Sequence, residues 1–547
     1  MKHLIPLLLV LLLSSCSNSQ DETSPIAFEI QKISIGNAQN QTTFIDVDPS
    51  ATILLEFTDA VEESTIRRSI TLQKNGANIN YNFQLKENKR IEITAAPYFD
   101  NFSTYQLTIH PNLKSTSGVI LSNGKIYTIK VGMDHTDKFD RIPDEELMTL
   151  VQKQTFKYFW DFAHETSGMA RERSTSGNTV TTGGTGFGIL SMIVAVERGF
   201  ITRQEAVQRI NRITTFLETN CTTYHGAFAH WINGETGQTI AFSEADNGAD
   251  LVETALLFQG LLTARAYFNQ AVAQETTLRN NITRMWEAID WNWFQKGGEN
   301  KLYWHWSPTN NWQMNMPISG WNEGLIVYAL AAASPTHPIS KEVYDQGWAR
   351  NGNFRNGQSY YGHKLPLGPE KGGPLFLSHY SFLGINPKGL TDAYADYWEQ
   401  NTNHTLINYQ YCMENPKGFS GYGENCWGLT ACDGDKGYNA FSPTNDQGVI
   451  APTAALSAFP YTPEQSLKAL HFYYYKLGDK LWKQYGFVDA FNLTANWYDN
   501  QHLAIDQGPI IVMIENHRTG LIWRLFMSVP EIQAGMKRLG FNSPMFN

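Results

Sequence analysis

The spacing of the hydrophobic residues changes once along this chain, and that change limits the folds open to it. From Ile26 to Met133, short runs such as "TILLEFTD" and "TYQLTIHP" alternate apolar and polar residues and are separated by Asn, Gly, Pro and Asp. Alternation with a period of two is typical of strands that bury one face. After Pro143 the apolar residues recur with a helical period instead. The sequence therefore predicts an all-β region followed by an all-α region.

The β region is expected to span residues 25–133. Its seven alternating runs predict an antiparallel β-sandwich. The stretches "FTDAVEESTI" and "STYQLTIHPNLKSTSGVIL" resemble a bacterial immunoglobulin-like (Ig-like) domain. A polar segment, residues 134–142, follows and is expected to be a linker. No residues in this region point to chemistry, so we expect it to serve as a spacer or support.

The α region is expected to span residues 143–547 and to contain about a dozen helices, among them Leu375–Leu383, Gly448–Ala458 and Pro530–Leu539. The predicted helices Gly248–Phe268 and Trp321–Ala333 are apolar all round over Leu251–Leu262 and Gly324–Ala333, whereas the predicted helix Arg203–Thr219 is amphipathic. Buried helices that alternate with half-exposed ones suggest an inner and an outer ring. The fold class predicted for the whole chain is therefore multidomain, an all-β Ig-like sandwich followed by an all-α (α/α)6 toroid.

The chain starts with "MKHLIPLLLVLLLSSC", which is typical of an export signal because its apolar run is too short to span a bilayer. Its "LSSC" end resembles the bacterial lipoprotein signal, in which the cysteine, here Cys16, is acylated. We expect residues 1–16 to be the signal peptide and residues 17–24 a tether. The prediction is an exported lipoprotein, in the periplasm or on the outer membrane, that touches the membrane only through its lipid anchor.

The composition excludes some partners and leaves other questions open. The net charge is −10 and lysine and arginine do not cluster, which argues against nucleic acid and anionic membrane surfaces. The chain has 15 Trp, 25 Tyr and 30 Phe, which could fill cores or form stacking surfaces for flat ligands. An exported chain permits disulfides, and the sequence does not decide whether Cys412, Cys426 or Cys432 forms one.

Acidic residues stand at the starts of several predicted buried helices. On a helix, Asp246, Asp250 and Glu253 would share one side, and Glu323 precedes the apolar run "GLIVYALAAA". Acids at helix starts are common because the helix dipole favours them by about 0.3–1 kcal/mol. A lone buried carboxyl group such as Glu323 is costly unless its pKa is raised. A carboxyl group with a raised pKa is the general acid that glycoside cleavage needs.

An inverting glycosidase also needs a second carboxylate, about 6.5–9.5 Å from the acid, to activate water. The stretches "NDQG" and "IDQG" place Asp446 and Asp506 at two further helix starts. Loops that join aromatic residues to amides and histidines suit a sugar, because rings stack on pyranose faces and polar groups bind hydroxyls. The candidate sugar-binding residues in these loops are His230, Trp231, Trp321, Trp427 and Trp497. Arg171 and Arg173 could bind acids or hydroxyls near the site, or form a salt bridge with Glu172.

Other motifs are weaker. "TTGGTGFG" has the glycines of a phosphate loop but no lysine and no preceding strand, so close packing at a helix start is expected instead. "DGDKG", from Asp433 to Gly437, hints at calcium but lacks the remaining acids of a calcium-binding loop. The cysteines match no zinc pattern, and the chain has no GxSxG motif. We therefore expect neither a metal nor a cofactor.

The runs "DNGADLVETALLFQGLLTARAYF", "WNEGLIVYALAAASPTHPI", "GENCWGLTACDGDKGY" and "IDQGPIIVMIENHRTGLIW" resemble the glucoamylase-like domain of Bacteroidetes lipoproteins. That group includes glycoside hydrolase family 144, whose characterised members cut β-1,2-glucan. The resemblance covers nearly all of residues 143–547. It implies an (α/α)6 barrel and an inverting mechanism without a metal. It also implies functional acids on a D-x3-D-x2-E pattern, which Asp246, Asp250 and Glu253 match. A glutamate like Glu323 would be the general acid. The general base would be an aspartate like Asp506, with Asp446 as the alternative.

The function predicted from the sequence is that of an inverting glycoside hydrolase that cleaves β-linked glucan. The preferred substrate in this prediction is β-1,2-glucan or sophoro-oligosaccharides, and the protein is expected to act as a monomer. One alternative is a non-catalytic glycan-binding lipoprotein, which the aromatic loops fit equally well. Another is a glycosidase for a different glucan linkage. A polysaccharide lyase is disfavoured because the predicted site is rich in acids, whereas lyases that act on uronates favour cationic sites. The sequence leaves the linkage and endo or exo action open.

Overall fold

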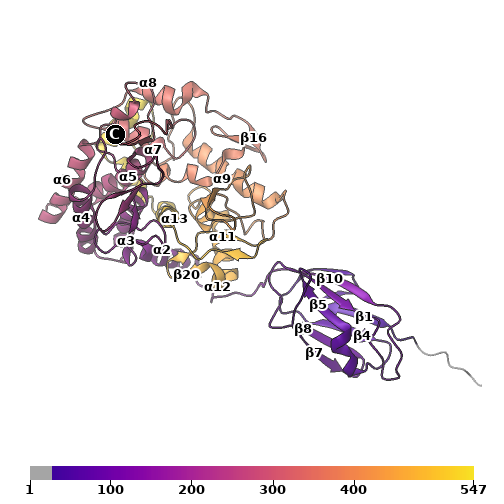
Figure 1. The fold of residues 1–547 in the computed structure, drawn as a ribbon. Helices are drawn as coiled ribbons and strands as arrows, with labels where there is room; N and C mark the ends of the chain where they lie inside the picture. Colours follow the sequence, from indigo (N-terminus) through magenta and orange to yellow (C-terminus); the bar gives the residue numbers. More distant parts are fainter. Residues whose placement is uncertain (1–26, 547) are drawn as a thin grey trace, which may run out of the picture. The chain divides into compact units, whose positions relative to one another are not determined.

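The computed structural model describes residues 27–546 and divides into two compact units, with the boundary between Asp134 and His135. The first unit is rich in strands and the second is mainly helical (Figure 1). The predicted signal peptide, the tether and Cys16 lie outside the described residues.

The first unit consists of two five-stranded sheets, ordered β2-β1-β4-β8-β7 and β3-β10-β9-β5-β6. Most neighbouring strands pair antiparallel, and β3 pairs parallel with β10. Alternate side chains of both sheets enter one hydrophobic core, as the period of two predicts. A short helix, α1 (Ile66–Ser69), precedes β5. The strands are β1 Ile30–Ile35, β2 Ala38–Gln39, β3 Thr43–Val47, β4 Ile53–Phe57, β5 Ile70–Lys74, β6 Ala77–Asn78, β7 Tyr81–Lys86, β8 Arg90–Ala95, β9 Thr104–Ile109 and β10 Lys125–Val131.

The second unit is built from α-helices joined by long loops, and several of these loops carry two- or three-residue strands. Its helices are α2 Asp144–Trp160, α3 Thr182–Glu197, α4 Arg203–Thr219, α5 Leu251–Tyr267, α6 Ala273–Glu287, α7 Leu325–Ala333, α8 Lys341–Val343, α9 Tyr397–Glu414, α10 Pro452–Leu456, α11 Pro463–His471, α12 Gly478–Leu481, α13 Ala504–Arg518, α14 Leu521–Met527 and α15 Pro530–Leu539. The loop strands are β11 Thr179–Thr181, β12 Trp231–Asn233, β13 Thr239–Ile240, β14 Ala249–Asp250, β15 His305–Trp306, β16 Ser359–Tyr360, β17 His363–Lys364, β18 Ala431–Cys432, β19 Asn439–Ala440, β20 Trp482–Lys483, β21 Gly486–Phe487, β22 Phe491–Asn492 and β23 Trp497–Tyr498.

Helices α3, α5, α7 and α13 are buried on nearly all sides, whereas α4 and α6 bury one face. Helix α3 packs against both α5 and α13, and α5 packs against α7. Helices α4 and α6 pack on each other and lie outside α3 and α5, at the left of the view in Figure 1. The four buried helices therefore form the interior of the unit, and the polar residues that matter below lie in their first turns or just before them.

Two helices begin later than the sequence predicts. Helix α5 starts at Leu251 because Asp250 caps it, its carboxylate accepting a hydrogen bond from the Glu253 amide at 2.9 Å. Asp246 therefore lies in a turn before the helix and not on a helical stripe with the other two acids. Helix α7 starts at Leu325, so Glu323 precedes the helix and does not lie in its first turn.

Two predicted helical segments are shorter or less regular than expected. The segment Leu375–Leu383 forms two 3-10 turns, Leu375–Ser378 and Ser381–Leu383, and does not form an α-helix. The helix expected from Gly448 is confined to α10, which begins with a proline that fits the first helical position. Among the described residues no helix is both long and apolar enough to cross a bilayer. All four cysteines in the described part of the chain are free thiols.

The glycines of "TTGGTGFG" serve close packing, which confirms that prediction. A Cβ at Gly186 in α3 would lie 2.2 Å from the Leu256 carbonyl oxygen in α5, and one at Gly260 would lie 2.3 Å from the Gly186 carbonyl oxygen. Both distances are far shorter than any real carbon–oxygen contact, so the two helices can approach this closely only without side chains at these positions. The contact fixes the first turn of α5 beside the first turn of α3.

Candidate active site

A cavity of about 390 Å³ opens into the second unit. Its walls come from the first turns of the buried helices and from the loops that precede them. They combine carboxyl groups with aromatic rings. The lining residues are Glu172, Arg173, Thr181, His230, Trp231, Phe242, Asp250, Val252, Glu253, Leu256, Trp304, Glu323, Phe376, Tyr380, Ala431, Tyr438, Leu503 and Ile505.

Asp250 and Glu253 reach this cavity from the start of α5. Glu253 accepts hydrogen bonds from the Gly183 amide at 2.7 Å and from the Thr181 hydroxyl at 3.2 Å, both near the start of α3. A Cβ at Gly183 would also lie 2.7 Å from a Glu253 carboxylate oxygen, so only glycine allows this approach. The helix-helix contact thus holds Glu253 in place through the backbone of its neighbour.

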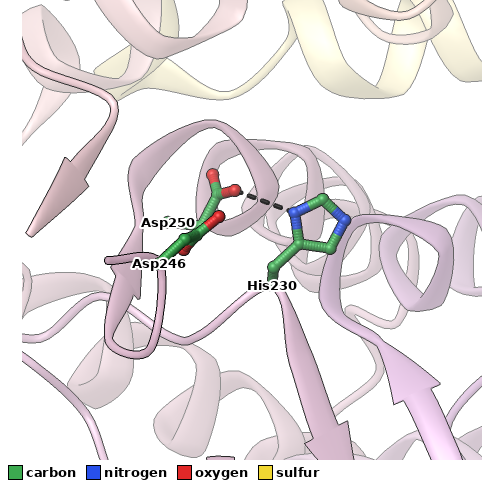
Figure 2. Close-up of side chains that lie close together, drawn as sticks. All are labelled: His230, Asp246 and Asp250. Carbon is green, nitrogen blue, oxygen red and sulfur yellow. Dashed lines mark hydrogen bonds and ion pairs between the residues drawn. The ribbon is translucent and has the colours of Figure 1, made fainter. Parts of the chain in front are cut away.

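His230 and His305 offset part of the negative charge. His230, which directly precedes β12, lies 3.0 Å from an Asp250 oxygen through its Nδ1, as Figure 2 shows. His305, on β15, places Nε2 at 3.4 Å from Asp246 and 3.7 Å from Asp250. Burial alone would lower the pKa of His230, but the charges of Glu253, Asp250 and Asp246 outweigh it and raise this pKa to about 9. His230 is therefore a cation at neutral pH.

The same contacts shift the pKa values of Asp246 and Asp250 in opposite directions. Burial acts to raise the pKa of Asp250, but the hydrogen bond and charge of His230 outweigh it, so the pKa is lowered. The pKa of Asp246 is raised by burial and by the nearby charge of Asp250. Asp250 is therefore the ionised member of this group, and Asp246 has the greater tendency to hold a proton.

Glu323 lies on the same cavity and is partly accessible from it. Burial, followed by the negative charges of Asp250 and Glu253, raises its pKa to about 7. The loop that carries it is fixed by the Ser381 hydroxyl, which donates to the Glu323 carbonyl, and by Asn322, which accepts from the Gly324 amide at 2.8 Å. Glu323 can therefore hold a proton near neutral pH beside an ionised carboxylate.

Asp506 lies in the first turn of α13 and is 2% exposed. It is not itself among the lining residues, but its neighbours Leu503 and Ile505 are, and its charge acts on Tyr380, which also lines the cavity. Burial raises its pKa to about 7, although a hydrogen bond with Asp489 and the charge of Arg173 oppose this change. Nothing in the chain near "GFVDAF" marks Asp489 as a partner of α13, so its position beside Asp506 is not predictable from the sequence.

Asp446, the alternative base, lies elsewhere. Its carboxylate accepts hydrogen bonds from the hydroxyls of Tyr411 at 3.0 Å and Tyr422 at 2.8 Å, and from the Gly448 amide at 2.9 Å. It does not line the cavity. These contacts occupy both carboxylate oxygens and hold the loop before α10 together.

The two arginines have different positions. Arg173 lines the cavity and forms ion pairs with Glu172 and with Asp433, each at 2.9 Å. Arg171 does not line it; its guanidinium lies over the Phe162 ring and donates to the carbonyls of Phe162 and Gly177. Arg173 therefore both forms a salt bridge and lies at the site, the two possibilities that the sequence left open.

Of the candidate tryptophans, Trp231 lines the cavity and three others do not. Trp321 packs against Phe382 and Tyr397 in the main core. Trp427 is fully buried, and Trp497 packs against a small cluster around Cys432. The aromatic walls come instead from residues that the sequence analysis did not single out, namely Phe242, Trp304, Phe376, Tyr380 and Tyr438. Trp304 belongs to the aromatic stretch "YWHWSPTNNW", which was the available signal for it.

This arrangement can do acid–base chemistry on a neutral polar ligand with flat apolar faces. One carboxyl group has a pKa near neutrality, another is ionised beside a histidinium, and rings surround both. Differently tuned carboxyl groups in one cavity are the usual mark of an acid–base pair.

The chain is similar to several known proteins. The family model described as glycoamylase, a glucoamylase family, matches residues 315–530. A curated exo β-1,2-glucooligosaccharide sophorohydrolase (non-reducing end) of Parabacteroides distasonis is 47% identical over 418 residues, which are 72% of this chain and 58% of that relative. This chain thus spans less than two thirds of that relative's length.

Two solved structures are also similar. The endo-β-1,2-glucanase of Chitinophaga pinensis, in complex with sophorotriose and glucose, is 51% identical with a TM-score of 0.73; the match covers 74% of this chain and all of that one. A β-1,2-glucanase from Parabacteroides distasonis is 38% identical with a TM-score of 0.71, and the match covers 93% of this chain and 74% of that one.

Proposed function

The chain belongs to the glucoamylase-like family, and from this premise we propose that it is a glycoside hydrolase that cleaves β-1,2-glucan or sophoro-oligosaccharides. The relatives named above act on β-1,2-linked glucose chains, which supports this substrate. The observation that carries the chemistry is Glu323, a carboxyl group with a pKa of about 7 that shares a cavity with Asp250 and Glu253. A group that keeps its proton near neutral pH can protonate a glycosidic oxygen.

In the proposed reaction Glu323 donates its proton to the leaving oxygen while a second carboxylate activates a water on the opposite face of the sugar, so that the anomeric configuration inverts. Asp250 and Glu253 accept hydrogen bonds from sugar hydroxyls, and Asp246 with His230 supports them. Trp231 and Trp304 present rings to the sugar faces. The cavity would bind one oligosaccharide chain, and the protein would act as a monomer.

We assign the base to Asp506 in preference to Asp446. Asp506 adjoins the cavity through Leu503, Ile505 and Tyr380. Asp446 accepts hydrogen bonds from two tyrosine hydroxyls and a backbone amide, and it does not line the cavity. The expected result is that Asp506→Asn abolishes turnover, whereas Asp446→Asn keeps it. Full turnover by Asp506→Asn would move the base elsewhere.

The direct test of the assigned acid is Glu323→Gln, which keeps the size of the side chain but cannot supply the proton. We expect an unchanged melting temperature and a loss of kcat of about 100-fold or more. Glu414→Gln, at an exposed position at the end of α9, is the matched control and should behave as the wild type. Normal turnover by Glu323→Gln would rule out this acid.

Products identify the substrate and the stereochemistry together. The wild type is incubated with β-1,2-, β-1,3-, β-1,4- and α-1,4-glucans, and products are followed by chromatography and anomeric NMR. Initial release of the α-anomer from β-1,2-glucan is the expected result, because inversion of a β-linkage gives an α-product. Calorimetric binding without any release of reducing sugar would favour a glycan-capturing protein and contradict the proposal.

The proposal extends to the architecture and the location. The series of packed buried helices α13, α3, α5 and α7, with α4 and α6 outside, supports an (α/α)6 barrel over residues 143–547. Two sheets around one core support an Ig-like domain over residues 25–133 with a linker at 134–142. The "LSSC" sequence supports acylation of Cys16 and an exported, lipid-anchored protein. A Cys16→Ser chain that still fractionates with membranes would contradict the anchor.

A further inference from the structure

Three aspartates that do not line the cavity lie close together, and one of them, Asp489, contacts Asp506. Asp433 follows β18, Asp489 lies between β21 and β22, and Asp499 follows β23. One carboxylate oxygen from each lies within 4.8 Å of the others. The residues are far apart in the sequence, so the motif "DGDKG" contributes only Asp433 to the group. We call Asp433, Asp489 and Asp499 the aspartate cluster.

Two members of the cluster, Asp489 and Asp499, are buried and short of hydrogen-bond donors. Asp489 is 1% exposed and Asp499 is 8% exposed. One oxygen of Asp489 accepts from the Asp433 amide at 2.7 Å, and one oxygen of Asp499 accepts from the amides of Asn500 and Gln501. The other oxygen of Asp499, Oδ2, has no partner among the described residues, and the other oxygen of Asp489, Oδ1, receives no N–H or hydroxyl donor from them; the Asp489 carboxyl group instead lies against that of Asp506. Buried oxygens without donors are costly, so each of them needs a proton, a hydrogen-bond donor or a cation.

A fourth carboxyl group, that of Asp506, lies next to the cluster and is also buried. Asp506 is 2% exposed, its Oδ2 receives no N–H or hydroxyl donor from the described residues, and its carboxyl group lies within hydrogen-bonding reach of Asp489. Arg173 supplies positive charge on one side, through its ion pair with Asp433. Neither Asp489 nor Asp499 forms an ion pair within the described part of the chain.

We propose that the aspartate cluster binds a calcium ion. Oxygens that each lie about 2.3–2.6 Å from one Ca²⁺ can be up to about 5 Å apart, which fits the spacing of the three ligand oxygens. Donors that are all carboxylate oxygens favour a hard cation over zinc or copper, and ligands from three separate loops suit calcium, which tolerates irregular geometry better than magnesium does.

The alternative is a proton shared between Asp489 and Asp506. One proton would satisfy that pair but would leave Oδ2 of Asp499 without a partner, whereas a cation contacts all three aspartates at once. The geometry therefore favours the ion. Bound calcium would join the loops after β18, β21 and β23 and hold Asp489 against the first turn of α13. The inference concerns binding and does not depend on the proposed hydrolase activity.

The test uses the full chain, stripped with EGTA and desalted. Titration with CaCl2 in a calorimeter should show one site, and calcium should raise the melting temperature. Asp499→Asn should weaken calcium binding by about tenfold or more, because it removes one charged ligand. Asp435→Asn is the matched control: it lies in the same "DGDKG" loop, bonds to Asn492 and is outside the cluster. It should bind calcium as the wild type does.

Several outcomes would overturn the proposal. No heat and no thermal shift with calcium in the wild type would leave the shared proton as the explanation. Equal losses in Asp435→Asn and Asp499→Asn would place the ion in the loop motif instead. Magnesium that binds more tightly than calcium would contradict the assigned ion. If Asp499→Asn does not fold, the test is Tb³⁺ luminescence of the wild type. Calcium should displace bound Tb³⁺ and reduce its emission; emission that does not fall when calcium is added would contradict the site.

Discussion

Glu323 and Asp250 face the same cavity, yet their pKa values move in opposite directions. Burial acts to raise both. For Asp250 the bonded, positively charged His230 reverses the effect. For Glu323 the nearby charges are those of Asp250 and Glu253, which add to it. Neighbours a few ångströms away thus decide which carboxyl group can give a proton and which can only accept hydrogen bonds.

This assignment predicts the alkaline side of the pH profile. A general acid works only while it is protonated, so kcat/KM should fall as the pH rises through about 7, the pKa of Glu323. Above that point the loss should approach about tenfold per pH unit, as for a single deprotonation. The measurement is initial rates on a sophoro-oligosaccharide between pH 5 and 9 on a stable enzyme. A flat profile from pH 6 to 8 would argue against Glu323 as the acid.

His230→Gln tests how the charge of His230 stabilises the fold as the pH changes. The folded-state pKa of His230, about 9, exceeds the value near 6.5 of an unfolded chain, so its charge stabilises the fold fully below about pH 6.5 and is lost as the pH rises through 9. The variant should be less stable by about 1.5–3 kcal/mol at pH 6, the value of a hydrogen bond to a charged group. The deficit, measured by urea unfolding, should shrink toward pH 9.5; a deficit that does not change with pH would contradict this account.

At the scale of elements, close contact between α3 and α5 sets the site. Gly186 and Gly260 let the two backbones touch, and this places the Gly183 amide on Glu253. The chain positions its acids by capping and helix packing, and the loops add the aromatic walls.

Gly186→Ala should therefore damage stability and activity together. Its Cβ would lie 2.2 Å from backbone, which cannot rotate away, so we expect a loss of about 2–3 kcal/mol and a lower melting temperature. Activity at a temperature where the variant is folded should fall as well, because Glu253 shifts. Gly423→Ala is the control, since a Cβ there meets nothing within 4 Å. A wild-type melting temperature for Gly186→Ala would contradict the packing argument.

At the scale of the whole molecule, every residue that lines the cavity belongs to the second unit. Each unit has its own hydrophobic core, as expected of domains that can fold separately. Residues 135–547 expressed alone should therefore keep kcat on short oligosaccharides within about twofold of the full chain. Circular dichroism checks that the fragment is folded. A folded but inactive fragment would show that the first unit contributes to the reaction.

The sequence by itself determined the order of the two regions, the bounds of helices such as α4 and α15, and the acids at the starts of the buried helices. These features follow from local causes: hydrophobic period, capping and turn residues. Local causes also explain the errors, because neither the cap at Asp250 nor the turn at Asn322 stands out within a longer apolar run.

Only the tertiary structure decided which of these residues meet. Trp321 and Trp427 have the same sequence character as Trp231, yet both are buried away from the cavity. Asp446 shares the DQG motif of Asp506 but bonds to tyrosines. Asp489 and Asp499 join Asp433 from loops distant in the chain. A side chain's pKa, and whether it faces a cavity or a core, depend on neighbours brought by the fold. Local sequence cannot encode those neighbours.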